Sequence, residues 1–201
     1  TDQTPVLLSL SRVAFEKNIH ALVEAMPDIL EKEPAAQLLI VGEGPARPTL
    51  ERQVREMGLQ DHVSFTGQVD NDQVCHYYHM ADVFVSASDS ETQGLTYDEA
   101  LASDLPIVVM RSEYTDELID DPAIGRSFQK RTDLVDGVLE YLATPPSPEA
   151  IAKRREKLHD ISAEVFGQRV LDFYRVCQEE VAEKKRPGFG RRFRHLRNQN
   201  D

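Results

Sequence analysis

The chain has 201 residues, of which 40% are hydrophobic and 29% charged, a composition typical of a globular α/β domain. No apolar run approaches the roughly 20 residues of a membrane-spanning helix, which excludes a transmembrane protein. Only two cysteines are present, so a disulfide framework is not expected and a reducing cytosol suits the chain. The chain does not begin with Met and has no signal-peptide pattern, which predicts a fragment of a longer protein.

Charge is unevenly distributed along the chain. The formal net charge is -12, yet seven basic residues fall in one acid-free stretch near the C-terminus: Lys184, Lys185, Arg186, Arg191, Arg192, Arg194 and Arg197. The remainder is therefore more acidic than the net charge indicates, and a body of that sign repels nucleic acid. We expect no nucleic-acid partner.

Short β-branched runs alternate with amphipathic stretches in the first three quarters of the chain. We predict strands at 6–11, 37–41, 63–66, 83–86, 107–110 and, more weakly, 126–128, and helices at 18–31, 48–57, 72–80, 96–103, 113–119 and 133–143. Such alternation is typical of a parallel sheet with helices on both faces. The predicted fold class is α/β, a doubly wound Rossmann-like parallel sheet.

Prolines at 145, 146 and 148 divide this pattern from a helical region. Ser147 is predicted to be the N-cap of a helix at 149–161, with Pro148 at its first position, and a second helix is predicted at 163–183. We therefore expect three parts: a nucleotide-binding domain over 1–146, C-terminal helices over 147–183 that pack on it, and a basic, flexible tail over 184–201. The tail is either an interfacial segment on an anionic membrane or a disordered solubilising extension.

The loop after the first predicted strand contains two cations, Arg12 and Lys17, ahead of a helix start. Ligands of open parallel sheets bind beyond the carboxyl ends of the strands, and anions are favoured near helix N-termini. The two side chains either bind phosphate or are solvated surface charges.

Glycines follow the second predicted strand in Gly42-Glu43-Gly44. A dinucleotide fingerprint needs a third glycine, but Arg47 stands at that position, and no P-loop GKS or GKT follows. We interpret these glycines as a tight strand-to-helix turn, which disfavours a dehydrogenase or a P-loop NTPase.

Metal-binding residue types occur after the third predicted strand, where Asp70 and Asp72 precede a helix carrying His76 and His79. No further ligands cluster nearby at a metal spacing. We predict that one of the two aspartates caps the helix, and that the protein uses no metal.

The most informative segment runs from Ser88 to Pro106. Glu91 lies in a polar loop and Glu99 on the following helix, with Gly94 between them. Free amides around Gly94, Leu95 and Thr96 would accept a phosphate, and carboxylates are suited to the hydroxyl donors of a sugar. Alternatively, both glutamates are ordinary exposed acids.

These residues resemble the E-x7-E signature of retaining glycosyltransferases of family 4, which have the GT-B fold. Arg12 and Lys17 resemble that family's earlier basic pair, and the turn at Gly42 its glycine turn, over about Val6 to Leu142. The stretch from Ser112 to Ile119 is most similar to bacterial diacylglycerol glucosyltransferases. Asp104 stands where the family has glycine, and because Asp tolerates the left-handed conformation the turn can be kept.

The resemblance implies a role for each matching position. Arg12 and Lys17 would bind the donor diphosphate and neutralise the leaving group, Glu91 would bind the transferred sugar and Glu99 the ribose. Gly42 and the amides of Gly94, Leu95 and Thr96 would complete the phosphate site, and the backbone of Gln68 and Val69 would contact the base. Glu91, Arg12 and Lys17 are the expected catalytic residues.

The resemblance also implies that the chain is one half of a GT-B enzyme, the C-terminal donor-binding domain. The implied reaction transfers a hexose, glucose by the narrower similarity, from a UDP-sugar to an acceptor such as diacylglycerol, with no cofactor beyond the donor. An N-terminal domain of the same protein would hold the acceptor, so the isolated chain would be inactive. We expect a cytoplasmic protein, peripheral on the inner face of the cell membrane. The alternatives are a sugar-nucleotide epimerase of the same fold and a non-catalytic nucleotide-binding domain.

Overall fold

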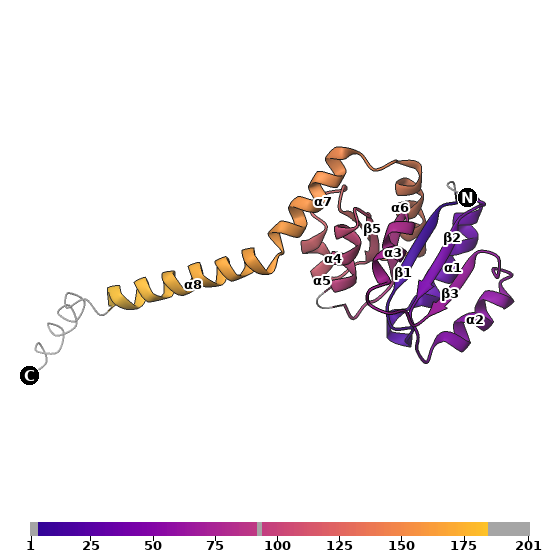
Figure 1. The fold of residues 1–201 in the computed structure, drawn as a ribbon, viewed down its shortest axis with the longest axis horizontal. Helices are drawn as coiled ribbons and strands as arrows, with labels where there is room; N and C mark the ends of the chain where they lie inside the picture. Colours follow the sequence, from indigo (N-terminus) through magenta and orange to yellow (C-terminus); the bar gives the residue numbers. More distant parts are fainter. Residues whose placement is uncertain (1–3, 92–93, 185–201) are drawn as a thin grey trace, which may run out of the picture. The chain divides into compact units, whose positions relative to one another are not determined.

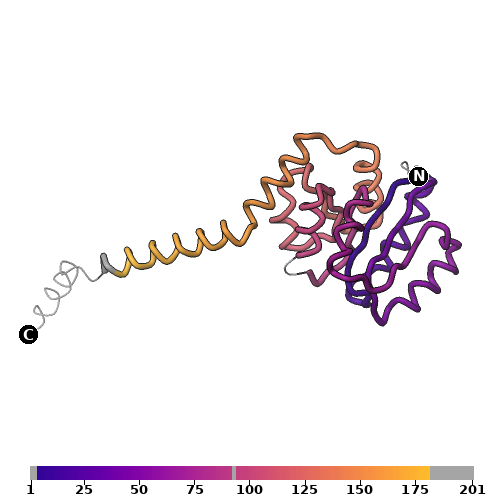
Figure 2. The backbone as a smooth tube through the Cα atoms, in the orientation of Figure 1, coloured from indigo at the N-terminus to yellow at the C-terminus, as the bar shows by residue number. Residues whose placement is uncertain are grey.

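A computed structural model describes residues 4–91 and 94–184. Six parallel strands form one sheet in the order β3-β2-β1-β4-β5-β6 (Figure 1). Their bounds are β1 Val6–Leu10, β2 Gln37–Val41, β3 Val63–Gly67, β4 Val83–Ser86, β5 Ile107–Met110 and β6 Gly125–Phe128. The first three strands, β1 to β3, form one half of the sheet and the last three, β4 to β6, form the other, so the early and later parts of the backbone trace lie on different sides (Figure 2). The predicted doubly wound sheet is confirmed, the weak sixth strand included.

Helices cover both faces of the sheet. Their bounds are η1 Phe15–Lys17 (a short 3-10 helix), α1 Ile19–Leu30, α2 Arg47–Glu56, α3 Val74–Met80, α4 Leu95–Ala102, α5 Glu113–Leu118, α6 Arg131–Ala143, α7 Pro148–Asp160 and α8 Ala163–Lys184. One buried cluster joins the sheet to α1, α2 and α6, and a second joins it to α3, α4 and α5. The domain is thus a three-layer sandwich, as alternating strands and helices require.

The amino-acid pattern explains this layering. In β1, Leu7 belongs to the first cluster and Leu8 to the second, because successive strand residues point to opposite faces. In α1, buried residues recur at Ile19, Leu22, Val23 and Met26, the spacing that places them on one side of a helix. Strands buried on both faces therefore read as continuous apolar runs.

Two predicted caps have different outcomes. Ser147 is confirmed as the cap of α7, since its Oγ accepts from the amide of Ala150 at 3.1 Å. The prediction that Asp70 or Asp72 caps the next helix is wrong: Gln73 is the N-cap of α3 and makes no side-chain capping bond. A backbone turn precedes α3 instead, with the Gln73 amide donating to the carbonyl of Asp70 at 2.9 Å.

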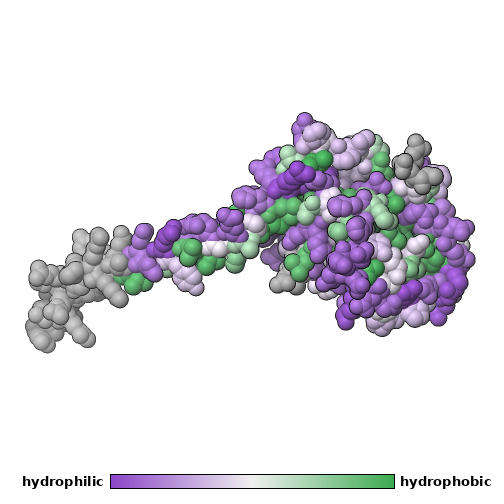
Figure 3. Space-filling view, in the orientation of Figure 1, coloured by the Kyte–Doolittle hydropathy of each residue, from purple (hydrophilic) through white to green (hydrophobic). Residues whose placement is uncertain are grey.

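The chain divides into two compact units, Thr1–Leu158 and His159–Asp201. In the first unit, α7 is anchored by Leu158, which packs against the second buried cluster, and by the buried Arg154. In the second, α8 carries large exposed apolar side chains, among them Phe166 and Phe173, and hydrophobic surface is visible along it (Figure 3). Of the predicted tail, residues 185–201 lie outside the described residues. Across the part of the chain that is described, no helix combines the length and apolarity needed to span a membrane.

Candidate functional site

The strand order reverses between β1 and β4, and the crevice beyond their carboxyl ends is where open α/β sheets bind ligands. An open hollow of about 400 Å³ lies at this edge. It is lined by the last residues of β1 and β2, by the segments that follow β1, β2 and β3, and by one residue each of α3 and α4: Leu10, Ser11, Arg12, Val41, Gly42, Glu43, Gln68, Val69, Asn71, Val74 and Thr96. Five residues expected from the sequence to contact the donor thus share one cavity: Arg12, Gly42, Gln68, Val69 and Thr96.

Gly42 fixes two of these segments against each other. Its φ of 135° lies in the region that favours glycine, and a Cβ at this position would stand 2.0 Å from the carbonyl oxygen of Ser11. The amide of Val13 donates to the carbonyl of Glu43 at 2.9 Å, and that of Ala46 to the carbonyl of Val13 at 3.0 Å. The glycines therefore form a tight strand-to-helix turn, as predicted, and hold the Arg12 loop at the rim.

The two expected cations differ in their surroundings. Arg12 is exposed at the hollow and forms an ion pair with Glu16 one helical turn on. Lys17 is half-buried at the end of η1, and its Nζ lies 3.1 Å from Oε2 of Glu91 and 3.4 Å from Oγ of Ser88. The fold thus brings Lys17 and Glu91 into direct contact.

Glu91 is held from both of its oxygens. While Oε2 faces Lys17, Oε1 accepts from the amide of Gly94 at 3.2 Å. Gly94 has φ 60° and is the N-cap of α4, so Leu95 and Thr96 occupy the first turn, where helix amides lack intrahelical acceptors. These amides and Lys17 make the start of α4 suited to an anion.

Glu99 lies one turn further along α4 and is supported by a buried tyrosine. The hydroxyl of Tyr78 donates to Oε2 of Glu99 at 2.8 Å and lies 3.2 Å from the carbonyl of Thr96, which lines the hollow. Burial, and next the bond to Glu99, raises the pKa of Tyr78, so the phenol keeps its proton. The Tyr78 hydroxyl therefore links Glu99 to Thr96, which lines the hollow.

Three residues near this edge were not expected from the sequence: Tyr78, Asp98 and Tyr114. Oδ1 of Asp98 is buried with no hydrogen-bond partner among the described residues, and burial, with the charge of Glu99 adding, raises its pKa to about 6. The ring of Tyr114 stands against Gly94, so that a Cβ there would lie 2.4 Å from its hydroxyl oxygen. No usable signal in the sequence indicated any of the three, although a buried tyrosine hydroxyl such as that of Tyr78 usually has a hydrogen-bond partner in the fold.

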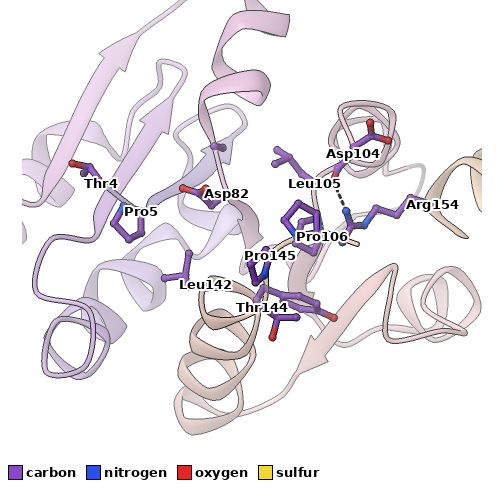
Figure 4. Close-up of a pocket in the computed structure, with 13 residues that line it drawn as sticks. Thr4, Pro5, Asp82, Asp104, Leu105, Pro106, Leu142, Thr144, Pro145 and Arg154 are labelled. Atoms are coloured by element: carbon purple, nitrogen blue, oxygen red, sulfur yellow. Dashed lines mark hydrogen bonds between the residues drawn. The ribbon is translucent and has the colours of Figure 1, made fainter. Parts of the chain in front are cut away.

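The described residues contain no group of three or more His, Cys, Asp and Glu side chains able to hold a metal ion. A second hollow, of about 360 Å³, lies at the opposite, amino-terminal edge of the sheet (Figure 4). There Arg154 donates to the backbone carbonyls of Asp104 and Ala123, and Asp104 has φ 61°. Asp104 thus keeps the left-handed turn expected of glycine, and Arg154 fastens it.

Comparisons with known proteins show the family of the chain. The family described as Glycosyl transferases group 1 matches residues 1–158. An alpha-monoglucosyldiacylglycerol synthase of Streptococcus pneumoniae is 44% identical over 174 residues, which are 86% of this chain and 39% of that protein. A synthase of the same name from Acholeplasma laidlawii is 36% identical over 151 residues, 75% of this chain and 38% of that protein.

Solved structures show the same fold. A mutant of S. aureus TarM, crystallised with fondaparinux, alpha-GlcNAc-glycerol and UDP, superposes with a TM-score of 0.75 at 24% identity. The match covers 86% of this chain and 35% of that one. The expected half of a GT-B fold is thereby confirmed, and the chain spans about two fifths of the curated relatives it matches.

Proposed function

Because this chain belongs to the group 1 glycosyl transferases, we propose that it is the donor-binding half of a retaining glycosyltransferase that takes a UDP-sugar. The observation that carries the proposal is the contact between Lys17 and Glu91, 3.1 Å apart across 74 positions of sequence, beside the hollow that Arg12 lines. A cation for phosphate and a carboxylate for hydroxyls then meet at one edge of the sheet. A lone surface cation or carboxylate would not indicate a ligand, but a cation and a carboxylate together beside the first turn of α4 match the phosphates and hydroxyls of a sugar diphosphate.

The proposed chemistry is electrostatic. As the bond between sugar and diphosphate breaks, negative charge develops on the leaving phosphate, and donors already aimed at it lower the barrier. Arg12, Lys17 and the amides of Leu95 and Thr96 would stabilise this charge. Glu91, whose Oε2 faces Lys17, would accept hydrogen bonds from the transferred sugar and keep it beside the diphosphate.

The nucleoside would occupy the rest of the hollow. Glu99 would accept from the ribose hydroxyls, and the backbone at Gln68 and Val69 would contact the base. Gly42, at the floor of the loop that carries Arg12, would let the diphosphate approach the backbone closely. Support comes from the lining of one cavity by Arg12, Gly42, Val69 and Thr96.

The acceptor side would belong to the rest of the protein. The two synthases reported above are named for monoglucosyldiacylglycerol, so we propose glucose as the sugar and diacylglycerol as the acceptor. An N-terminal domain would supply the acceptor groove. The basic segment 184–201 would hold the enzyme at the anionic inner face of the cell membrane.

Titration calorimetry of the 201-residue chain with UDP, GDP, ADP and UDP-glucose tests the donor. We expect UDP and UDP-glucose to bind, and no sugar to be transferred by this chain alone. If GDP binds and UDP does not, the proposed base is wrong. If none of the nucleotides binds, a non-catalytic scaffold domain is favoured. An epimerase is not proposed, since none of the relatives reported above is one.

Charge-removing variants test the site itself. Arg12→Ala and Lys17→Ala should each weaken UDP binding about tenfold, the cost of one charge-assisted hydrogen bond, and make it less sensitive to salt. Arg52→Ala is the matched control for Arg12, because Arg52 is similarly exposed and also pairs with a glutamate one turn on. Equal affinity in the wild type and both site variants would refute the assignment.

A further inference from the structure

Tyr78 is a buried polar residue to which the donor site described above assigns no role. It lies on α3, only 2% of its surface is exposed, and its ring centroid is 6.0 Å from that of Phe84 in β4. The ring centroid of Phe84 is in turn 5.8 Å from that of Tyr97 in α4. The Tyr78 ring is therefore fixed by the core, and its hydroxyl has a set position.

The single proton of this hydroxyl has two acceptors within reach. The Glu99 carboxylate oxygen is at 2.8 Å and the Thr96 carbonyl oxygen at 3.2 Å. The carboxylate is the closer one, and a bond to an ionised acceptor is roughly twice as strong as one to a neutral acceptor. The phenol keeps its proton because its pKa is raised by burial first and by Glu99 second. Tyr78 is thus a permanent donor to Glu99.

This bond changes what Glu99 can do. A glutamate on an exposed helix face samples many rotamers, and fixing it costs conformational entropy each time a ligand is bound. With Oε2 held by a rigid phenol, Oε1 and the remaining lone pairs stay free to accept from a ligand. Thr96, whose carbonyl oxygen lies beside the same hydroxyl, is a residue that lines the hollow.

We propose that Tyr78 is the positioning residue that aims Glu99 at the ribose diol, and so sets the preference of this site for ligands with free ribose hydroxyls. The inference rests on the proposed function, in which Glu99 binds the ribose. It extends that function to a residue of the core that touches no ligand. Tyr78 acts through a bond of 2.8 Å to the side chain that does.

The test measures binding of UDP and of 2′,3′-dideoxy-UDP to the 201-residue chain and its Tyr78→Phe variant by calorimetry. We expect the variant to bind UDP about five- to tenfold more weakly, the value of one hydrogen bond to a charged group, and dideoxy-UDP within about twofold of the wild type. In a Glu99→Ala background the same change should add less than about twofold, because the acceptor of the Tyr78 hydroxyl is gone.

Tyr97→Phe is the matched control. Tyr97 is also fully buried, and its hydroxyl bonds to Oγ of Ser86 at 3.2 Å rather than to Glu99. It should lose stability without losing the preference for UDP over dideoxy-UDP. Thermal unfolding of each variant without ligand separates stability from binding.

The outcomes distinguish the positioning role of Tyr78 from the proposed donor site. If the wild type prefers UDP over dideoxy-UDP and Tyr78→Phe keeps the full preference, or weakens both ligands equally, the positioning role is overturned while the donor site stands. If the wild type binds both ligands equally, or neither, then Glu99 does not bind ribose, and the proposed function and this inference are both overturned. Should Tyr78→Phe fail to fold, a Glu99→Ala variant that keeps the full preference for UDP would overturn the inference.

Discussion

Gly94 offers the sharpest test of how the backbone builds the candidate site. Its φ is 60°, a conformation in which an L side chain costs about 1–2 kcal/mol. A Cβ would also stand 2.4 Å from the hydroxyl oxygen of Tyr114 and 2.5 Å from its Cε1, well inside contact distance. Pushing that half-buried ring aside adds about 1–3 kcal/mol, the usual cost of overpacking. We therefore expect Gly94→Ala to destabilise the domain by about 2–5 kcal/mol.

Gly58→Ala provides the control, because Gly58 has φ 70° but no atom lies within 4 Å of the place that its Cβ would take. It should cost only about 1–2 kcal/mol, and the entropy that alanine removes from the unfolded chain is the same at both sites and cancels. Urea denaturation followed by circular dichroism gives both free energies of unfolding. If Gly94→Ala costs no more than Gly58→Ala, the close packing of Tyr114 on the loop is refuted. A Tyr114→Ala change should recover part of the difference.

Two further predictions concern buried charge. The pKa of Asp98 is raised to about 6, so its ionisation opposes folding and its contribution to the stability of the domain falls as pH rises from about 4 to 6. Asp98→Asn should therefore stabilise the domain by about 1–2 kcal/mol above pH 6, allowing for solvent screening, and by much less near pH 4. Urea denaturation at several pH values measures this difference. Equal effects at both ends would contradict it. Arg154→Met should lower the free energy of unfolding by about 2–4 kcal/mol, because two backbone carbonyls lose their hydrogen-bond donor. Arg155→Met is the control: Arg155 is exposed and pairs with Asp104, so its loss should cost only about 0–1 kcal/mol. Equal unfolding free energies for the two variants would refute the role of Arg154.

The sheet could be predicted because its strands are buried on both faces and stand out as apolar runs between amphipathic stretches. The predicted side-chain cap of α3 was wrong, because backbone hydrogen bonds take its place. Asp70 and Asp72 have the composition of a helix cap, yet the turn before α3 satisfies its amides with carbonyls. The 3-10 turn η1 was not predicted either, since three residues carry too little periodicity to read.

The candidate site was predictable only as separate segments. Residue types after each strand indicated which loops reach the carboxyl edge, but not that Lys17 would contact Glu91 or that Tyr78 would bond to Glu99. The pairs are 74 and 21 positions apart, and their contacts depend on strand order and helix rotation. Tyr78 was hidden for another reason: a tyrosine among buried apolar residues indicates core packing, and only coordinates locate its hydroxyl.

In the Lys17–Glu91 ion pair, one positive and one negative side chain near the start of α4 neutralise each other. A simple anion such as sulfate, by drawing Lys17 away, would leave a half-buried carboxylate without its counter-charge, and that loss offsets much of the attraction. A molecule offering phosphate oxygens and hydroxyl protons together can satisfy both partners at once. In the proposed site the pair would therefore act as a selectivity filter, which would favour glycosyl phosphates over the inorganic ions that share their charge.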